Sequence, residues 1–516
     1  MAIIEFTSWT PDLPDLGNGG MLVARNVFPL SRGYGPVPAP IVYPGPSALS
    51  ARVVGAFSAK DKAADTYNYA ATVGGSNTGK LYRLVGAAWT DASGDGSDST
   101  AGYDLTDGNP VEWVKWGESV IAGWLLEPLQ TIDFGGSNFS NLVVSSRKPR
   151  FKHLAVLRDF VVGGNCDDVS ADGVVPNRVW WSGIGDPSTF EDGTGTTQSD
   201  YQDLQVGGAI RKVIGGETGR IFCESAIYRL TYLGYSPWFQ IDQIAENKGA
   251  WVSGSVAVYG KSAIFLDRDG WYLHNGDGPV PIGINKIDEF FLADFDSSFD
   301  YRCSSLIDPV RKVYHFLYPS VGAMGGIPDR MLSYDIVNER WTITEITGEW
   351  LTLFLGIGYT LDGLDAISTS IDALTVSLDS PTYQSKGQEL AVYNDSHQLC
   401  VFRGDPLTAT LETGERQILG PGSTRTMVGD VRPLVDGART NTHSDGPYET
   451  EVTVQALKRD RQSDELVEGR IVTMNQYGNC PMRENARFHR FRVTISGGFH
   501  HAIGLDVSAT AAAGRR

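Results

Sequence analysis

The sequence predicts an all-β fold, a β-propeller whose blades are antiparallel meanders. The chain contains 60 Gly and 25 Pro residues, which are typical of many tight turns, together with 21 Tyr, 21 Phe and 12 Trp. Between the turns lie short runs of alternating or β-branched residues, the pattern of strands. Units with several such strands recur with a period of about 45 residues, which is typical of propeller blades.

The clearest unit covers residues 255–283 and shows how each blade is predicted. Its sequence is SVAVYGKSAIFLDRDGWYLHNGDGPVPIG, with strands expected through Phe265 and Leu273. Turns are expected at Gly260-Lys261, Asp269-Gly270 and Asp277-Gly278, because Gly and Asp favour the two-residue turns that join antiparallel strands. Comparable units cover residues 52–93, 111–136, 152–191, 211–244, 305–346 and 391–419.

The same patterns divide the chain into three parts. Residues 1–50 are Pro-rich and aperiodic, so we expect an extended N-terminal arm that lies on a surface and has no core of its own. Residues 51–420 are predicted to form the propeller, with about six to seven blades and room for an insertion near 355–390. The longer strands expected in residues 421–516 predict a C-terminal β-rich closing domain.

Charge and hydropathy restrict the partners. The chain has 43 Lys and Arg against 61 Asp and Glu, a net charge of −18, which disfavours tight wrapping of nucleic acid but permits a channel through which DNA passes. The N-terminus lacks the basic and long apolar regions of a secretion signal, so we expect folding in the cytoplasm. No apolar run approaches the ~18 residues that span a bilayer, and no membrane insertion by this chain is expected.

The five cysteines are scattered singly along the chain. No C-x-x-C pair is present and the number is odd, so the pattern indicates neither a zinc cluster nor a disulfide framework. We expect buried free thiols at these positions, which are Cys166, Cys223, Cys303, Cys400 and Cys480.

One stretch, GGSNTGKLYRL, resembles a phosphate-binding loop. Gly74, Gly79 and Lys80 have its spacing, but Leu81 stands where the magnesium-binding hydroxyl is needed. The alternating residues that follow predict a strand, whereas a phosphate loop opens a helix. A similar GGETGR occurs at residues 215–220, so we interpret both as structural turns between blade strands, with Lys80 in solvent.

Two acidic loops begin like calcium loops, at residues 91–98 and 167–173. Neither has a Glu at the twelfth position, which is Gly102 when counted from Asp91 and Val179 when counted from Asp168. Solvated loops are the favoured interpretation, and a calcium site stays the alternative for both.

Catalytic patterns are incomplete throughout the chain. Asp267, Asp269 and Trp271 occupy a turn that lacks the residues of a glycosidase Asp-box, and Ser182 precedes both glycines of WSGIGD instead of standing in G-x-S-x-G. His489, His500 and His501 have no metal-binding spacing. We therefore predict no catalytic, cofactor-binding or metal-binding residues, no cofactor, and a protein that is not an enzyme.

Four stretches resemble the tail hub proteins of short-tailed bacteriophages, which are also called nozzle or packaged-DNA stabilisation proteins. They are RNVFPLSRGYGPVPAP (25–40), NRVWWSGIGDPSTFE (177–191), RIFCESAIYRLTYLG (220–234) and ARFHRFRVTISGGFHHAIGLDV (486–507). The resemblance implies a structural subunit of the virion tail, made in the host cytoplasm. It also implies a homo-hexameric ring below the portal and adaptor, which retains the double-stranded DNA genome, forms part of the ejection channel and anchors fibres, spikes or a needle.

The matching residues look like folding determinants and not like contacts to a partner. We expect that those near the N-terminus pin the arm, that the next group packs blade strands, and that the last group seats the closing strands. They are Asn26, Pro29, Tyr34 and Pro36; Trp180, Trp181 and Phe190; and Arg487, Phe488 and Phe491. A propeller hydrolase acting on glycans and a glycan-binding lectin or adhesin are the alternative functions.

Overall fold

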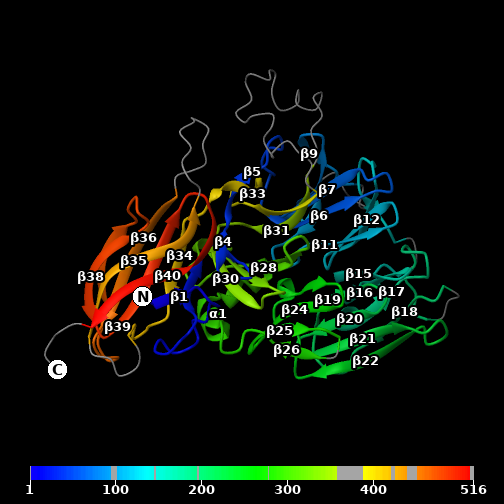
Figure 1. Ribbon diagram of the computed structural model, residues 1–516. Coiled ribbons are helices and arrows are strands. Elements are labelled where there is room, and N and C mark those ends of the chain that lie inside the picture. The colour runs from blue at the N-terminus through cyan, green and yellow to red at the C-terminus, as the bar shows by residue number, and fades with distance from the viewer. Residues whose placement is uncertain are drawn as a thin grey trace, which may run out of the picture.

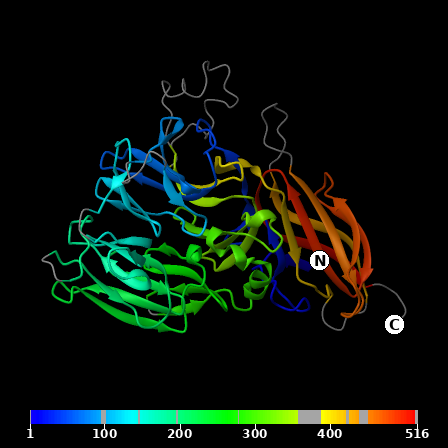
Figure 2. The ribbon, with the colours of Figure 1, turned by 180° about the vertical axis from the view of Figure 1, so that it is seen from behind.

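The computed structural model contains a β-propeller and a β-sandwich that lie side by side (Figures 1 and 2). It describes residues 2–94, 102–143, 147–193, 197–276, 278–356, 387–419, 425–437 and 450–511. Seven antiparallel sheets form the propeller, so the predicted all-β propeller is confirmed. None of the helices in the described ranges has the length and apolar character required to cross a membrane.

The first four blades follow one another along the chain, each with its innermost strand first. Blade one contains β6 (Val53–Lys60), β7 (Thr66–Thr72), β8 (Gly74–Val85), β9 (Ala88–Asp91) and β10 (Tyr103–Leu105), and blade two contains β11 (Glu112–Trp116), β12 (Ser119–Trp124), β13 (Glu127–Asp133) and β14 (Ser140–Asn141). Blade three contains β15 (Arg150–Leu157), β16 (Phe160–Asp168), β17 (Gly173–Trp181) and β18 (Asp200–Asp203), and blade four contains β19 (Ile210–Ile214), β20 (Gly219–Cys223), β21 (Ala226–Tyr232) and β22 (Phe239–Glu246).

The last three blades complete the ring, with short helices between some strands. Blade five contains β23 (Ala257–Tyr259), β24 (Ser262–Asp267), β25 (Gly270–His274) and β26 (Pro279–Pro281), and blade six contains β27 (Ser304–Asp308), β28 (Val313–Tyr318), β29 (Arg330–Asp335) and β30 (Arg340–Glu345). Blade seven contains β31 (Trp350–Leu355), β32 (Gln388–Tyr393), β33 (Leu399–Pro406) and β5 (Pro38–Val42). The helices are η1 (Ser253–Ser255), α1 (Asp288–Asp294), η2 (Ser297–Arg302) and η3 (Met324–Gly326). The meander predicted for residues 255–283 is confirmed as blade five.

Buried side chains fill the space between every pair of neighbouring blades. Tyr43 and Val53 pack with Phe354 between blades one and seven, and Phe222 packs with Phe265 between blades four and five. Equivalent clusters occupy the other five interfaces, and the cluster between blades five and six continues into the sandwich. The seven blades therefore form a closed ring, in which each sheet buries both faces.

The ring is closed by a strand from the N-terminal arm. β5 pairs antiparallel with β33, and the hydrogen bond from Tyr43 N to Leu399 O, 2.8 Å, extends this pairing. The chain enters blade one immediately after β5, so the beginning and the end of the propeller are held together by backbone hydrogen bonds. Blade seven consequently receives three strands from one end of the propeller and one from the other.

The sandwich is formed by the C-terminal strands and three strands of the arm. Its members are β34 (Ala409–Thr413), β35 (Thr426–Gly437), β36 (Glu451–Arg459), β37 (Val467–Thr473), β38 (Cys480–Ala486), β39 (Phe488–Ser496) and β40 (Phe499–Ala511), with β1 (Ala2–Glu5), β3 (Val27–Pro29) and β4 (Tyr34–Pro36). One sheet has the order β3-β4-β40-β35-β38, with β1 on β40. The other contains β34, β39, β36 and β37.

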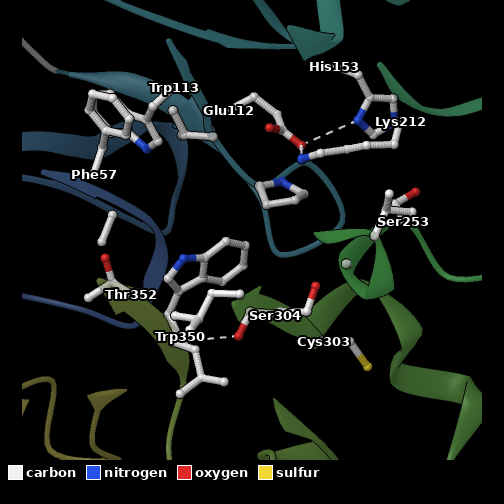
Figure 3. A pocket seen from close by; sticks show the side chains of 18 of the residues that line it. Phe57, Glu112, Trp113, His153, Lys212, Ser253, Cys303, Ser304, Trp350 and Thr352 are labelled. Carbon is white, nitrogen blue, oxygen red and sulfur yellow. Dashed lines mark hydrogen bonds and ion pairs between the residues drawn. The ribbon is translucent and has the colours of Figure 1, made fainter. Parts of the chain in front are cut away.

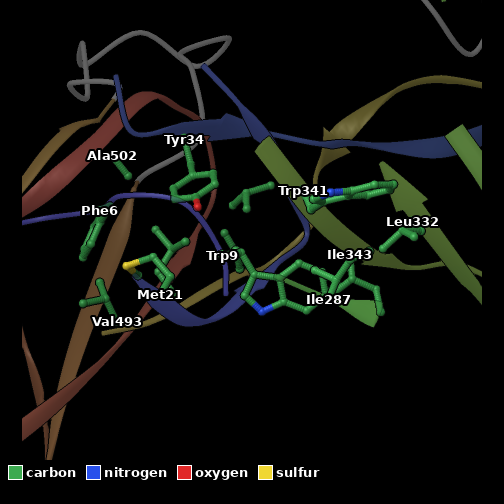
Figure 4. Close-up of a cluster of buried hydrophobic side chains, with 14 of the residues drawn as sticks. Phe6, Trp9, Met21, Tyr34, Ile287, Leu332, Trp341, Ile343, Val493 and Ala502 are labelled. Carbon is green, nitrogen blue, oxygen red and sulfur yellow. The ribbon is translucent and has the colours of Figure 1, made fainter. Parts of the chain in front are cut away.

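The second sandwich sheet is continuous with blade six through β2 (Met21–Arg25). The order β27-β28-β29-β30-β2-β34-β39-β36-β37 makes one nine-stranded sheet, in which β2 lies parallel to β30 and antiparallel to β34. Figure 4 shows the core beneath this junction, where Trp9, Met21 and Trp341 lie between the propeller and the sandwich. We call this shared sheet and its core the junction.

Asn26 links the two modules directly. Its backbone N donates to Ile343 O at 2.8 Å, its side-chain Nδ2 donates to Thr408 O at 2.9 Å, and its Oδ1 accepts from Glu345 N at 2.9 Å. The backbone of Asn26 has φ 58°, the left-handed region that Asn tolerates better than most residues. The expectation that Asn26 pins the arm is confirmed.

The arm differs from the surface segment that we expected. Trp9, Tyr34 and Tyr43 are almost completely buried, and the arm contributes strands to both modules. Burial of one large apolar side chain contributes roughly 1.5–3 kcal/mol, so the arm supplies a substantial part of the core. Its strand partners outside the arm come from residues 340–511, and Trp9 and Asp12 also contact residues 286–290. Partners so distant in sequence explain why the arm itself shows no periodicity.

Other expectations can be compared with the structure residue by residue. The five cysteines are free and buried, and Trp180, Trp181 and Phe190 pack between blade strands. Phe488 and Phe491 are buried in the sandwich. The last propeller strand ends at Pro406 and β34 already belongs to the sandwich, so the boundary expected at 420 lies one strand too late. Most of the insertion expected near 355–390 lies outside the described residues.

Substitution of Asn26 tests the junction. Asn26→Gly removes two side-chain hydrogen bonds and should lower the free energy of unfolding by about 1–3 kcal/mol. Asn26→Ala adds left-handed strain and should cost about 1 kcal/mol more. Denaturant unfolding followed by tryptophan fluorescence measures both changes.

Asn247 is the matched control, because it is exposed, has φ 56°, and its side chain forms no hydrogen bond with any described residue. Asn247→Gly should be nearly neutral and Asn247→Ala should show the strain alone. Equal stability of Asn26→Gly and the wild-type protein would contradict the role given to the Asn26 side chain.

Candidate functional site

The stretch that resembles a phosphate loop is part of β8. Lys80 lies opposite Thr72 on β7, and its Nζ is 3.0 Å from Asp91 Oδ2 of β9, so it is ion-paired and only partly exposed, not free in solvent as expected. A Cβ on Gly79 would lie 2.7 Å from Leu105 Cβ, which shows that this glycine permits the close approach of β10. The strand is confirmed, and so is the glycine role, because the chain reverses between Thr72 and Lys80 and a Cβ on Gly74 would lie 2.2 Å from Gly79 N.

The related stretch at residues 215–220 is a true turn between β19 and β20. Gly216 has φ +118°, and a Cβ on Gly215 would lie 1.9 Å from Val156 O of the neighbouring blade. Arg220 is almost completely buried, and its Nη1 lies 3.3 Å from His274 Nδ1. Both glycine-rich stretches are therefore explained by backbone packing.

The acidic loop at 167–173 is neutralised by arginines. Asp168 is fully buried and forms ion pairs with Arg147 and Arg178, and Arg178 also donates to Asp172 at 2.7 Å. The hydrogen bond from Arg178 lowers the pKa of Asp172. Carboxylates engaged in this way are poor ligands for calcium, which needs their oxygens. Residues 95–98 of the other acidic loop lie outside the described residues.

The remaining candidate residues are structural. Asp267 and Asp269 both form ion pairs with Lys248, at 3.2 and 2.5 Å, while Trp271 is fully buried in the junction core. Burial raises the pKa of Asp267 and Lys248 lowers it. Ser182 is buried, and its Oγ accepts from Val161 N at 3.0 Å.

The three histidines considered in the C-terminal region differ in their exposure to solvent. His489 is buried between two backbone carbonyl oxygens, those of Thr426 and Ala486, whereas His500 and His501 are exposed on β40. Within the described ranges, no group of three His, Cys, Asp or Glu side chains could hold a metal ion.

A central cavity of about 360 Å³ lies where the inner strands of the blades converge (Figure 3). Its lining comes from β6, β11, β15, β19, η1, β27 and β31, which are spread over some 300 residues of sequence. No sequence motif marks these positions, and their only common signal is that they lie at or just before the first strand of a blade. This cavity is the candidate functional site.

A charged group crosses three blades at one side of the cavity. Glu112 on β11 lies 2.5 Å from Lys212 Nζ on β19, and its Oε1 is 3.4 Å from His153 Nδ1 on β15 between them. Figure 3 shows the three side chains converging. Glu112 is 41 residues from His153 and 100 residues from Lys212 in the sequence, so this group directly links blades two, three and four.

The protonation states of this group follow from burial and charge. Burial alone would raise the pKa of Glu112, but Lys212 and His153 outweigh it and lower the pKa to about 2. Burial lowers the pKa of His153 to about 4, against the opposing effect of Glu112. At pH 7 Glu112 is therefore ionised and His153 is neutral, with Nδ1–H directed at the carboxylate and Nε2 left as an acceptor.

Aromatic side chains line other parts of the cavity. Trp113 stacks on Phe57 with ring centroids 6.5 Å apart, and Trp350 contributes a second indole from β31. Lys152 and Arg211 add two cations from β15 and β19, and Asp300 adds a carboxylate from η2. The cavity therefore combines flat apolar surfaces with charge of both signs.

Glu112 and Cys303 are the lining residues whose protonation states follow most directly from their surroundings. A glycosidase needs one carboxyl whose raised pKa lets it act as an acid, whereas Glu112 is ion-paired and its pKa is lowered. Cys303 is the thiol in the lining, and burial raises its pKa well above the ordinary value, so it is protonated.

Comparisons with known proteins add little to this description. A scan against protein-family models and a search of curated proteins both found no match. Among solved structures, the WD40 domain of Neurospora crassa Pan2 is similar at 7% identity and a TM-score of 0.36, over 78% of this chain and 96% of that one. The architecture described above accordingly depends on the sheets and on the packing between them.

A double-mutant cycle tests the link across three blades. Glu112→Gln and Lys212→Met should each lower the free energy of unfolding by about 1–3 kcal/mol. The first leaves the Lys212 ammonium group without its carboxylate, and the second leaves Glu112 with only the hydrogen bond from neutral His153. The double variant should be less destabilised than the sum, with a coupling of about 1–2 kcal/mol from denaturant unfolding.

The exposed pair Glu118 and Lys62, whose charged atoms are 3.7 Å apart, provides the matched control cycle. Glu118→Gln with Lys62→Met should give a coupling below about 1 kcal/mol. Equal coupling free energies in the two cycles would show that the cavity pair stabilises the fold no more than an exposed ion pair does.

The stability of the protein should fall as the pH drops from 6.5 to 4, in part through His153. The unfolded chain binds a proton at this residue near pH 6.5, while the folded protein binds it only near pH 4, so acid favours unfolding across this window. Between pH 6.5 and pH 4, the His153→Asn variant should lose about 2–3 kcal/mol less of its free energy of unfolding than the wild-type protein does.

The measurement is the denaturant midpoint at several pH values between 4 and 7. His500→Asn, on an exposed residue of β40, is the control and should leave the slope unchanged. The measurements above pH 5 test His153 most directly, because the stabilising effect of ionised Glu112 is lost only below pH 4.5. A slope that His153→Asn does not alter would contradict the neutral state of His153.

Proposed function

We propose that the chain is a structural subunit of a bacteriophage tail, a tail hub that assembles into a ring below the portal and adaptor. In this role it retains packaged DNA, forms part of the ejection channel and anchors fibres, spikes or a needle. The observation that carries the proposal is the junction, in which the propeller and sandwich share one sheet and one core.

Two of the four segments that resemble tail hub proteins meet at the junction, while residues 177–191 and 220–234 lie in blades three and four. Residues 25–40 contain the end of β2, all of β3 and β4 and the start of β5, and residues 486–507 contain β39 and most of β40. Tyr34 of the first segment lies opposite Ala502 of the second in the sheet, and its hydroxyl donates to Thr7 O. These two segments therefore contain residues that fix how the two modules are placed.

A fixed placement of two modules is what a ring subunit between a portal and fibres requires. The continuous sheet resists rotation of the sandwich relative to blade six, and the ion pairs Arg25–Glu345 and Arg330–Glu345, at 3.0 and 2.6 Å, add support at its surface. In such a subunit, one module can contact its neighbours in the ring while the other module contacts a different partner. The net charge of −18 is compatible with DNA that passes without being held.

Assembly with the portal and adaptor of the same genome tests the proposal. The purified 56.0 kDa chain, alone and mixed with both partners, would be measured by mass photometry and imaged by electron cryo-microscopy. We expect six copies in a ring below the adaptor.

A portal and adaptor from an unrelated phage serve as the control and should recruit no ring. A chain that stays monomeric with its own portal and adaptor would overturn the tail hub proposal. That outcome would leave the fold unchanged, because the fold follows from the pairing and packing of the sheets.

A further inference from the structure

The central cavity has a cation that its own carboxylates do not neutralise. Lys152, Arg211 and Lys212 line it together with Glu112 and Asp300. Glu112 forms an ion pair with Lys212, and Arg211 forms one with Glu224 at 2.6 Å. Among the described residues, no side chain forms a hydrogen bond or an ion pair with the Lys152 ammonium group; the charge of Arg211 lowers its pKa and the charge of Asp300 raises it.

The position of Lys152 concentrates positive charge at one wall. Lys152 is on β15 and Arg211 is on β19, the inner strands of neighbouring blades. Burial lowers the pKa of Lys152, and the positive charge of Arg211 lowers it further. An anion placed beside Lys152 and the remaining N–H groups of Arg211, whose Nη2 is paired with Glu224, would relieve the repulsion between the two cations.

Two buried polar atoms of the lining also lack partners within the described part of the chain. They are Trp113 Nε1, a donor, and His153 Nε2, which belongs to a side chain that is 2% exposed. Buried polar atoms of this kind are ordinarily hydrogen-bonded. Together with the Trp350 indole, they give the cavity a flat apolar surface with polar atoms at its edge.

We propose that the central cavity binds a small molecule that carries an oxyanion, carboxylate or phosphate, on a planar ring. The oxyanion lies between Lys152 and Arg211, and the ring lies against the indoles of Trp113 and Trp350. His153 Nε2 accepts a hydrogen bond from a hydroxyl or N–H group of the ligand. A cavity of about 360 Å³ accommodates a ligand with one or two rings.

Naphthalene carboxylate and naphthyl phosphate are the two probes, measured against the full-length protein by isothermal titration calorimetry at low salt. We expect at least one of them to bind with a Kd of about 1 mM or tighter, as its size allows. The stronger of the two identifies the oxyanion that the site takes. Neutral naphthamide should bind at least about tenfold more weakly, because it lacks the charge that Lys152 and Arg211 attract.

Lys152→Met should weaken binding at least about tenfold, and Lys152→Arg should retain most of it. Lys62→Met is the matched control, since it removes one Lys charge from an exposed position far from the cavity lining, and it should leave the Kd unchanged. Thermal unfolding of each variant verifies that it is folded. Absence of binding by both probes, naphthamide binding as tightly as the anions, or equal binding by the wild-type protein and Lys152→Met would each overturn the proposal.

Discussion

Closure of the propeller depends on one short pairing, that of β5 with β33. Five residues of the N-terminal arm supply the fourth strand of blade seven, and Tyr43 then packs between blades seven and one with Val53 and Phe354. Without this strand, blade seven would expose an unpaired edge and the interface with blade one would lose part of its core. Because the two strands are more than 350 residues apart, the ring can close only after almost the whole propeller has been made.

The same arm fixes the sandwich, so ring closure and module placement are coupled. β1, β3 and β4 pair within the sandwich, β2 joins its other sheet to blade six, and β5 closes the ring. Asn26 stands at the centre of this path, with hydrogen bonds to Glu345 N on one side and Thr408 O on the other. A disturbance of the arm therefore affects both modules together.

The sequence predicted those features that are local and missed those that join distant strands. Blade five was predicted strand by strand, because Gly260 and Gly270 mark its hairpins and alternation marks its strands. The arm was misplaced, because Trp9 and Tyr34 are buried against partners hundreds of residues away. The cavity escaped prediction for the same reason, since Glu112 and Lys212 are 100 residues apart and belong to no motif. Only the closed ring brings them together.

The nine-stranded sheet also determines how the subunit would carry mechanical load. A pull on the sandwich perpendicular to its strands is transmitted from β34 through β2 to β30 by backbone hydrogen bonds, and the parallel contact of β2 with β30 involves the single register pair Arg25 and Ile343. Under such a pull this short contact is the weakest step of the sheet, and the buried aromatic side chains beneath it must bear the remaining force. The molecule thus has a built-in site of mechanical failure at the junction, whereas each blade is secured on both sides by its neighbours.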